Sequence, residues 1–292
     1  MNSRLPIFVF AIFSLTGCDN IQSIFTPKPD IKYATYSVDY QSKPDFASIE
    51  QNFPLTTVDL DKITPRYLST LDQEQIDQIY ARLTAGPIPD GAFDGDLFFP
   101  RGGSGKLRLS EIVGGLPGLI VQLKGKKLDL IGETLWKGKV FYRNERVLRN
   151  RIEDINLLRT MGLVDGEPKK FDAKGKDAWL LFPARLYCGQ SLMDSRRESI
   201  IIDYAFTDEI AGYMEKPDFL AGRRGFKVRD EIRMVRPGFY LGRAYLDRIF
   251  ILNFTLVNDE IAARDGAAFT KTGQSPEDCW IGTQQRKVAA AQ

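Results

Sequence analysis

The chain has 292 residues, of which 43% are hydrophobic and 27% charged, so it has room for one large globular domain or two small ones. Its net charge is +2 and no run of Lys or Arg stands out, which gives no support for nucleic-acid binding. The chain has no His, which removes the most common general base and metal ligand. Three Cys are too few for a four-Cys zinc site. The composition therefore predicts neither a metal nor a cofactor.

The N-terminus has the pattern of a signal peptide. A weakly basic start at 1–4 precedes an apolar run at 5–15, which is too short for a bilayer core of ~30 Å. The run ends in Leu-Thr-Gly-Cys at 15–18, which resembles the lipobox of bacterial lipoproteins at every position. The resemblance implies that 1–17 are removed and that acylated Cys18 anchors the chain to a membrane. The alternative is an ordinary signal peptide whose cleavage site carries a Cys.

The same resemblance implies a place in the cell envelope, facing the periplasm. Asp19 resembles the signal that retains enteric-type lipoproteins in the inner membrane, and the outer membrane is the alternative. Residues 18–53 are polar and contain several prolines, so they are predicted to form a tether. Within them, residues 33–40 are either a short strand or linker.

Residues 54–87 are predicted to be a helical lead-in. The main helix is expected over 68–86, where Asp72 is a plausible N-cap and has the spacing of a capping box with Gln75. A single apolar stripe should pack this helix against a sheet; its members are Ile76, Ile79, Tyr80 and Leu83. Further on, residues 109–130 have mostly helical spacing interrupted by Gly and Pro, which predicts two short helices or one kinked helix.

The second half of the chain is dominated by predicted strands. A strand is expected within 88–100 and a hairpin over 135–142 and 147–152. Five further runs are rich in β-branched and aromatic residues, at 179–188, 198–206, 228–235, 238–246 and 249–258. The last three are joined by very short turns and predict an antiparallel meander. Long loops are expected at 155–177 and 208–228, either as binding loops or as surface insertions.

The W-x-G-K-x-F pattern at 136–141 is similar to the core of GXWXG-type domains, which are small antiparallel barrels related to the calycins. The preceding Gly of that pattern is Thr134 here. The region 88–258 also resembles a family of bacterial lipoproteins through A-G-P-I-P-D-G, F-P-A-x-x-Y-C-G-Q-S and V-R-P-G-F-Y-L-G-R, which implies no particular activity. The expected fold is α+β, mainly β, with a calycin-like antiparallel barrel or half-barrel, a few accessory helices and an N-terminal tether.

Two cysteines remain once Cys18 is acylated. Because the envelope permits oxidation, we predict a disulfide between Cys188 and Cys279 that staples the C-terminal tail, 259–292, to the domain. Closing a loop of about 90 residues contributes up to about 4–5 kcal/mol in the chain-entropy model. Two separately buried thiols are the alternative.

Strand alternation provides the candidate site. Arg243 shares one face of its strand with large apolar residues, and a buried Arg must be paired. Asp203, Asp230 and Glu231 are the expected partners. Arg185 is a second cation expected to point inward. Together these polar side chains would form the floor of an apolar cavity, the predicted polar floor, and bind the acidic head group of a ligand there. The candidate ligand-binding residues are Trp136, Arg185, Tyr187, Asp203, Tyr204, Asp230, Glu231, Arg243 and Tyr245.

The predicted function is therefore that of a non-catalytic envelope lipoprotein that binds a lipid or another apolar small molecule, with an acidic head group as one option. The alternative is a structural or interaction module without a ligand, in which the buried Arg and carboxylates only set strand register. A hydrolase using Asp203 with Asp230 or Glu231 is a third reading. The membrane is the expected partner, nucleic acid is not, and no envelope protein partner is identified.

Overall fold

The computed structural model describes residues 27–36, 44–102, 136–160, 162–173 and 176–282. The predictions for the signal peptide, for Cys18 and for helices over 109–130 lie outside these residues. No described helix is long and apolar enough to cross a membrane. Residues 33–36 form no strand, so the described part of 33–40 is linker.

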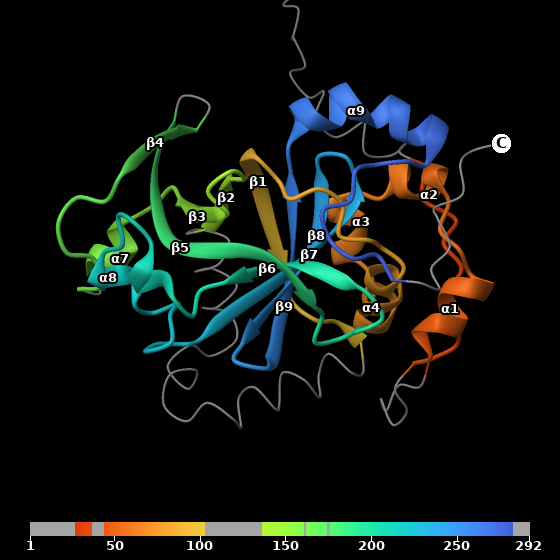
Figure 1. Cartoon of the computed structure of the whole chain (residues 1–292), viewed down its shortest axis with the longest axis horizontal. Helices are drawn as coiled ribbons and strands as arrows, with labels where there is room; N and C mark the ends of the chain where they lie inside the picture. Colours follow the sequence, from red (N-terminus) through yellow and green to blue (C-terminus); the bar gives the residue numbers. More distant parts are fainter. Residues whose placement is uncertain (1–26, 37–43, 103–135, 161, 174–175, 283–292) are drawn as a thin grey trace, which may run out of the picture.

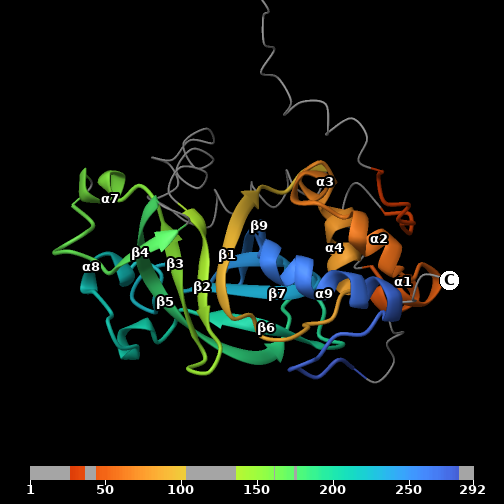
Figure 2. The same cartoon turned by 90° about the horizontal axis from the view of Figure 1, so that it is seen from above.

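The described strands form one sheet in the order β3-β2-β1-β9-β8-β7-β6-β5-β4. Their bounds are β1 Gly91–Phe98, β2 Trp136–Tyr142, β3 Val147–Ile152, β4 Lys170–Ala173, β5 Lys176–Gln190, β6 Glu198–Asp203, β7 Val228–Arg236, β8 Phe239–Leu246 and β9 Ile249–Val257. All neighbours are antiparallel, and β3 also pairs with β5, so the sheet closes into a barrel with β4 as an extra strand (Figures 1 and 2). The predicted hairpin, meander and mainly-β barrel are confirmed.

Helices gather mainly on one side of this barrel. The described ones are α1 Phe46–Asn52, α2 Thr57–Lys62, α3 Pro65–Ser69, α4 Gln73–Ala81, α7 Asn156–Thr160, α8 Glu215–Asp218 and α9 Asp259–Thr272, with a 3-10 turn η2 at Thr207–Glu209. Helices α1 to α4 and α9 lie beside β7, β8 and β9, whereas α7 and α8 lie at the opposite side (Figure 2). The predicted loops 155–177 and 208–228 thus contain the short elements α7, β4 and α8.

Helix α4 begins after Asp72, the predicted N-cap, and not at Leu68, which belongs to α3. The Asp72 capping box is present, and the Gln75 side chain accepts the Asp72 backbone N–H at 3.0 Å. The predicted apolar stripe is completely buried. The helix ends at Ala81, however, rather than near Gly86, and Arg82 is its C-cap.

Two helices lie in segments for which the sequence predicted none. Helix α1 lies inside the predicted tether 18–53, and its N-terminus is capped by the Asp45 side chain. Helix α9 lies in the predicted tail, capped by Asn258 and ended by Gly273 in the left-handed conformation. Each buries few apolar residues, so neither shows the apolar stripe by which a helix is recognised in sequence.

The tail beyond α9 is attached to the end of the barrel. Cys279 forms the predicted disulfide with Cys188 of β5. The Glu277 carboxylate accepts the backbone N–H of Gly86 at 2.7 Å, so the tail is also bound to the segment that leads into β1. The predicted stapling of the tail to the barrel is confirmed.

Aromatic rings fill much of the barrel interior. Phe93 packs edge-to-face on Phe141, and Trp136 packs in the same way on Phe254, with ring centroids 5.4 and 5.8 Å apart. Gly242 of β8 lies directly opposite Phe254 in the register, and a Cβ built on it would lie 2.2 Å from the Phe254 ring. Because Gly242 has no side chain, the Phe254 ring can lie this close to the backbone of β8.

We expect Gly242→Ala to lower the free energy of unfolding by about 1–3 kcal/mol, because the added methyl group overpacks the interior against Phe254. Denaturant unfolding measures the loss. The matched control is Gly266→Ala on α9, where a Cβ meets nothing within 4 Å and the helix should gain about 0.5–1 kcal/mol. Equal stability of Gly242→Ala and the wild type would contradict this account of the interior.

Candidate functional site

A polar cluster crosses the barrel interior from wall to wall. We call Trp136, Lys139, Asn150, Tyr204 and Asp230 the interior cluster. The Lys139 ammonium donates to the Tyr204 hydroxyl at 2.7 Å and to the Asn150 side-chain oxygen at 2.9 Å. It also pairs with the Asp230 carboxylate at 3.0 Å, and both side chains are at most 5% exposed. Because β2 and β7 lie on opposite sides of the ring, this ion pair bridges the interior.

Trp136 completes the cluster from the apolar side. Its indole N–H donates to the Asn150 side-chain oxygen at 2.9 Å. The Lys139 ammonium lies 5.5 Å from the Trp136 ring and 5.3 Å from the Phe254 ring, within the range of cation–π attraction. Gly95 makes room for the indole, since a Cβ there would lie 2.3 Å from it. The ammonium therefore has a partner for each of its three donors and aromatic faces around it.

The protonation states follow from these contacts. Burial by itself would lower the pKa of Lys139, but the Tyr204 hydroxyl and the Asp230 carboxylate raise it above its ordinary value. Burial raises the pKa of Tyr204 to about 12, so this residue is a neutral hydroxyl at physiological pH. One oxygen of Asp230, Oδ1, has no hydrogen-bond partner among the described residues. A protonated, fully bonded Lys is not a nucleophile, so the cluster has the character of a structural bridge.

Three of the residues that the sequence analysis selected lie in this cluster, namely Trp136, Tyr204 and Asp230. Lys139, which supplies the cation, and Asn150 were not predicted from the sequence. The W-x-G-K-x-F pattern contained Lys139, but alternation along β2 could have placed it on either face of the sheet. The barrel interior therefore combines apolar walls with a few polar groups, and its cation is Lys139 rather than the predicted Arg243.

The prediction that Arg243 faces the interior is wrong. Arg243 lies on the outer face of β8, where it pairs with Asp77 of α4 at 2.5 Å and donates to the Tyr245 hydroxyl at 3.0 Å. Its guanidinium lies 5.6 Å from the centroid of the Tyr80 ring, also on α4. Alternation showed correctly that Arg243 shares its face with large side chains. It could not show that α4 covers that face and brings the carboxylate.

The other predicted residues do not join one site either. Glu231 faces outward like Arg243, and its carboxylate accepts the backbone N–H of Leu192 at 2.7 Å. On the outer surface the Tyr187 hydroxyl donates to Asp203 at 2.8 Å. Arg185 is exposed and lies 3.8 Å from Glu209. The predicted single polar floor is thus replaced by an interior group, a group under α4 and a surface group.

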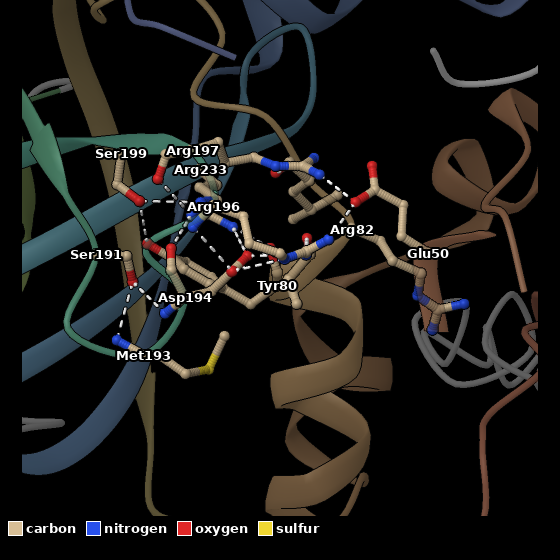
Figure 3. Close-up of polar contacts among 12 residues, drawn as sticks. Glu50, Tyr80, Arg82, Ser191, Met193, Asp194, Arg196, Arg197, Ser199 and Arg233 are labelled. Atoms are coloured by element: carbon tan, nitrogen blue, oxygen red, sulfur yellow. Dashed lines mark hydrogen bonds and ion pairs between the residues drawn. The ribbon is translucent and has the colours of Figure 1, made fainter. Parts of the chain in front are cut away.

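A buried arginine cluster, not predicted from the sequence, joins α1 to the barrel (Figure 3). Arg196 and Arg197 lie in the connection between β5 and β6, and both pair with Glu50 of α1. Asp194 in the same connection accepts from Arg196 at 2.8 Å and from Arg233 at 3.1 Å. Burial would raise the pKa of Asp194, but these two guanidinium groups hold it below its ordinary value.

Arg233 of β7 is the centre of this arginine cluster. Its side chain is fully buried and donates to the Ser199 hydroxyl at 2.9 Å and to the Tyr80 backbone carbonyl at 3.1 Å. It therefore links β6, α4 and the β5–β6 connection at one point (Figure 3). The only trace in the sequence is the pair Arg196-Arg197 close to Asp194, which gives no indication that Glu50 is their partner.

The outer surface has a hollow of about 520 Å³ between the β2–β3 hairpin, β5 and the segment after β6. It is lined by the apolar side chains Val147 and Ile210, the cations Arg149, Lys169 and Arg185, and the carboxylates Glu145 and Glu209. Arg149 lies in the wall of the hollow, where its guanidinium donates to the backbone carbonyls of Ala211 and Gly212. Positive charge exceeds negative charge by one among these side chains.

The comparisons with known proteins add no functional information. No family model matches the sequence, and no curated protein matches it. A crystal structure of a protein from Thermomonospora curvata aligns with a TM-score of 0.33 and 14% identity, covering 64% of this chain and 88% of that one. A similarity at this level indicates neither a family nor a function. The strand pairing and the described side chains define the class: a closed antiparallel barrel with an ion pair across its interior.

We expect Lys139→Met to cost about 3–5 kcal/mol of unfolding free energy, because it leaves Asp230 charged and buried without its partner. Adding Asp230→Asn should recover part of that loss. The matched control is Lys170→Met, whose pair with Asp177 is exposed and should contribute under about 1 kcal/mol. Chemical denaturation of the wild type, the two single variants and the double variant measures these differences. Equal losses for the two Lys substitutions would refute the bridge.

Proposed function

We propose that the protein is a lipid-anchored, non-catalytic module of the bacterial cell envelope that acts through its outer surface. The observation that supports the second part is the Lys139–Asp230 pair across the barrel. A ligand entering at this level would have to separate a buried ion pair and displace the rings around it, at a cost of several kcal/mol. The closed barrel therefore serves best as a rigid core.

The anchor is supported by the lipobox resemblance at 15–18 and by the way the following chain is attached. Ile31 is buried, and the Gln78 side chain of α4 both accepts from and donates to the Ala34 backbone, at 2.9 and 3.0 Å. The described chain is thus in contact with the domain within 27–36. Eight residues lie between Cys18 and residue 27, and the nine Cα–Cα steps from one to the other span at most about 32 Å in a fully extended chain. In this proposal the barrel stays close to the membrane.

Native mass spectrometry tests both parts of this proposal. Protein extracted from membranes should have the mass of 18–292 plus acyl chains. Cys18→Ser, made behind an ordinary cleavable signal peptide in place of 1–17, should be soluble and lack the acyl mass. The soluble variant, measured without detergent, should be free of bound small molecules. An unmodified Cys18 in membrane-derived protein would overturn the anchor, and a co-purified ligand lost in a Lys139 variant would overturn the solid interior.

The second candidate function is binding of an acidic amphiphile in the outer hollow. The specific observation is the hollow's chemistry: Arg185 and Lys169 stand beside the apolar Val147 and Ile210, and the volume of about 520 Å³ suits a small ligand. Arg185 was a candidate from the sequence, and Lys169 and Ile210 come from the two predicted long loops, for which ligand binding was one of two alternatives. An acyl carboxylate or phosphate would place its charge at the cations and its chain on the apolar wall.

For this candidate we expect decanoate to bind the soluble Cys18→Ser protein at least tenfold more tightly than decanol, measured by calorimetry. Arg185→Gln combined with Lys169→Gln should weaken decanoate binding about tenfold, because two charge contacts of about 0.5–1 kcal/mol each are lost. The matched control is Arg264→Gln on α9, which pairs with Asp265 away from the hollow. Equal binding of alcohol and carboxylate, or equal loss in the control, would contradict this candidate.

A further inference from the structure

We propose that Cys188, Glu198 and Cys279 form a binding site for a thiophilic divalent cation such as zinc when the disulfide is reduced. The two sulfur atoms and a Glu198 carboxylate oxygen all lie within 4.8 Å of one another. They come from β5, from β6 and from the tail, so three separate parts of the chain meet at one point. The site is distinct from the interior cluster and from the outer hollow.

The donor set suits zinc. Thiolates at about 2.3 Å and a carboxylate oxygen at about 2.0–2.2 Å are its usual ligands in proteins. Around one tetrahedral ion such atoms are about 3.3–3.8 Å apart, so small side-chain rotations would bring this trio to that spacing. Two Cys and one Glu leave a fourth position for water. The composition predicted no metal, because the chain has no His and too few Cys for a four-Cys site; two Cys with one Glu require neither.

The backbone holds the trio together independently of the disulfide. The Trp280 N–H donates to the Glu198 carboxylate at 2.8 Å, and the Glu198 N–H donates to the Trp280 carbonyl at 3.0 Å. On the other side of Cys279, the Asp278 carboxylate accepts the Ile88 N–H at 2.8 Å. Reduction therefore leaves the tail in place. The bond from Trp280 also orients the carboxylate, as supporting hydrogen bonds commonly do for metal ligands.

The two states exclude each other chemically. A dithiol reductant transfers two electrons and two protons to the disulfide, giving two thiols and the oxidised reductant. A divalent cation then binds both sulfurs as thiolates and releases the two thiol protons, so its affinity rises with pH. Either the disulfide or the cation staples the tail to β5. The protein would thus keep its C-terminal attachment in both redox states.

Cobalt provides the test, because thiolate ligation gives it a near-ultraviolet charge-transfer band. The full chain carrying Cys18→Ser, which has no third thiol, is reduced with a phosphine without oxygen and titrated with Co²⁺. We expect one ion per chain, displacement by Zn²⁺, and no band in the oxidised protein. Zinc should also raise the thermal midpoint of the reduced protein only.

Glu198→Gln distinguishes a three-ligand site from two incidental thiols. It keeps both Cys and an oxygen for the Trp280 N–H, and we expect it to weaken Co²⁺ binding at least tenfold. The matched control is Glu209→Gln, an exposed carboxylate in the outer hollow, which should bind Co²⁺ like the parent. No charge-transfer band in the reduced parent, or equal affinities of the parent and Glu198→Gln, would overturn the proposal.

Discussion

The pairing of β3 with β5 closes the sheet, and the barrel exists because of it. The other neighbouring pairs would leave an open, twisted sheet with β3 and β4 at its edges; the pairs from Val147↔Arg185 to Ile152↔Trp179 join β3 to the middle of the long strand β5 instead. Closure pairs β3 on both of its sides, leaves only the short strand β4 outside the ring, and creates an inside and an outside. From that point each residue's role is set by the face on which it lies.

The two faces use buried charge in different ways. Inside, Lys139 and Asp230 join opposite walls, so the ion pair and the rings around it resist flattening of the barrel. Outside, Arg243 and Arg233 lie under α4 and connect it to the sheet. Buried pairs of this kind contribute little net stability, since desolvation offsets their attraction, but a lost partner is costly. They therefore specify where the helices and walls meet.

Local sequence was a good guide to the strands and a partial guide to the site. The strands from β5 to β9 were found because β-branched and aromatic runs are separated by clear turns. The sequence predicted Trp136, Tyr204 and Asp230 as site residues, and they lie together in the interior cluster. The fold also brings Lys139 to this cluster. Helices α1 and α9 were missed because tertiary contacts and caps stabilise them, and neither leaves an apolar stripe in the sequence.

Sequence patterns alone identified every described strand except β4, the residues that share a face of each strand, and the two cysteines available to pair. These properties depend on the two-residue period of a strand and on counting. The packing of distant segments sets the rest: which face of each strand is the interior, the pairing of Arg243 with Asp77 on a helix, and the pairing of Glu50 with Arg196 and Arg197. Partners so distant along the chain meet only after the sheet has closed and the helices have packed on it, and no local pattern records that geometry.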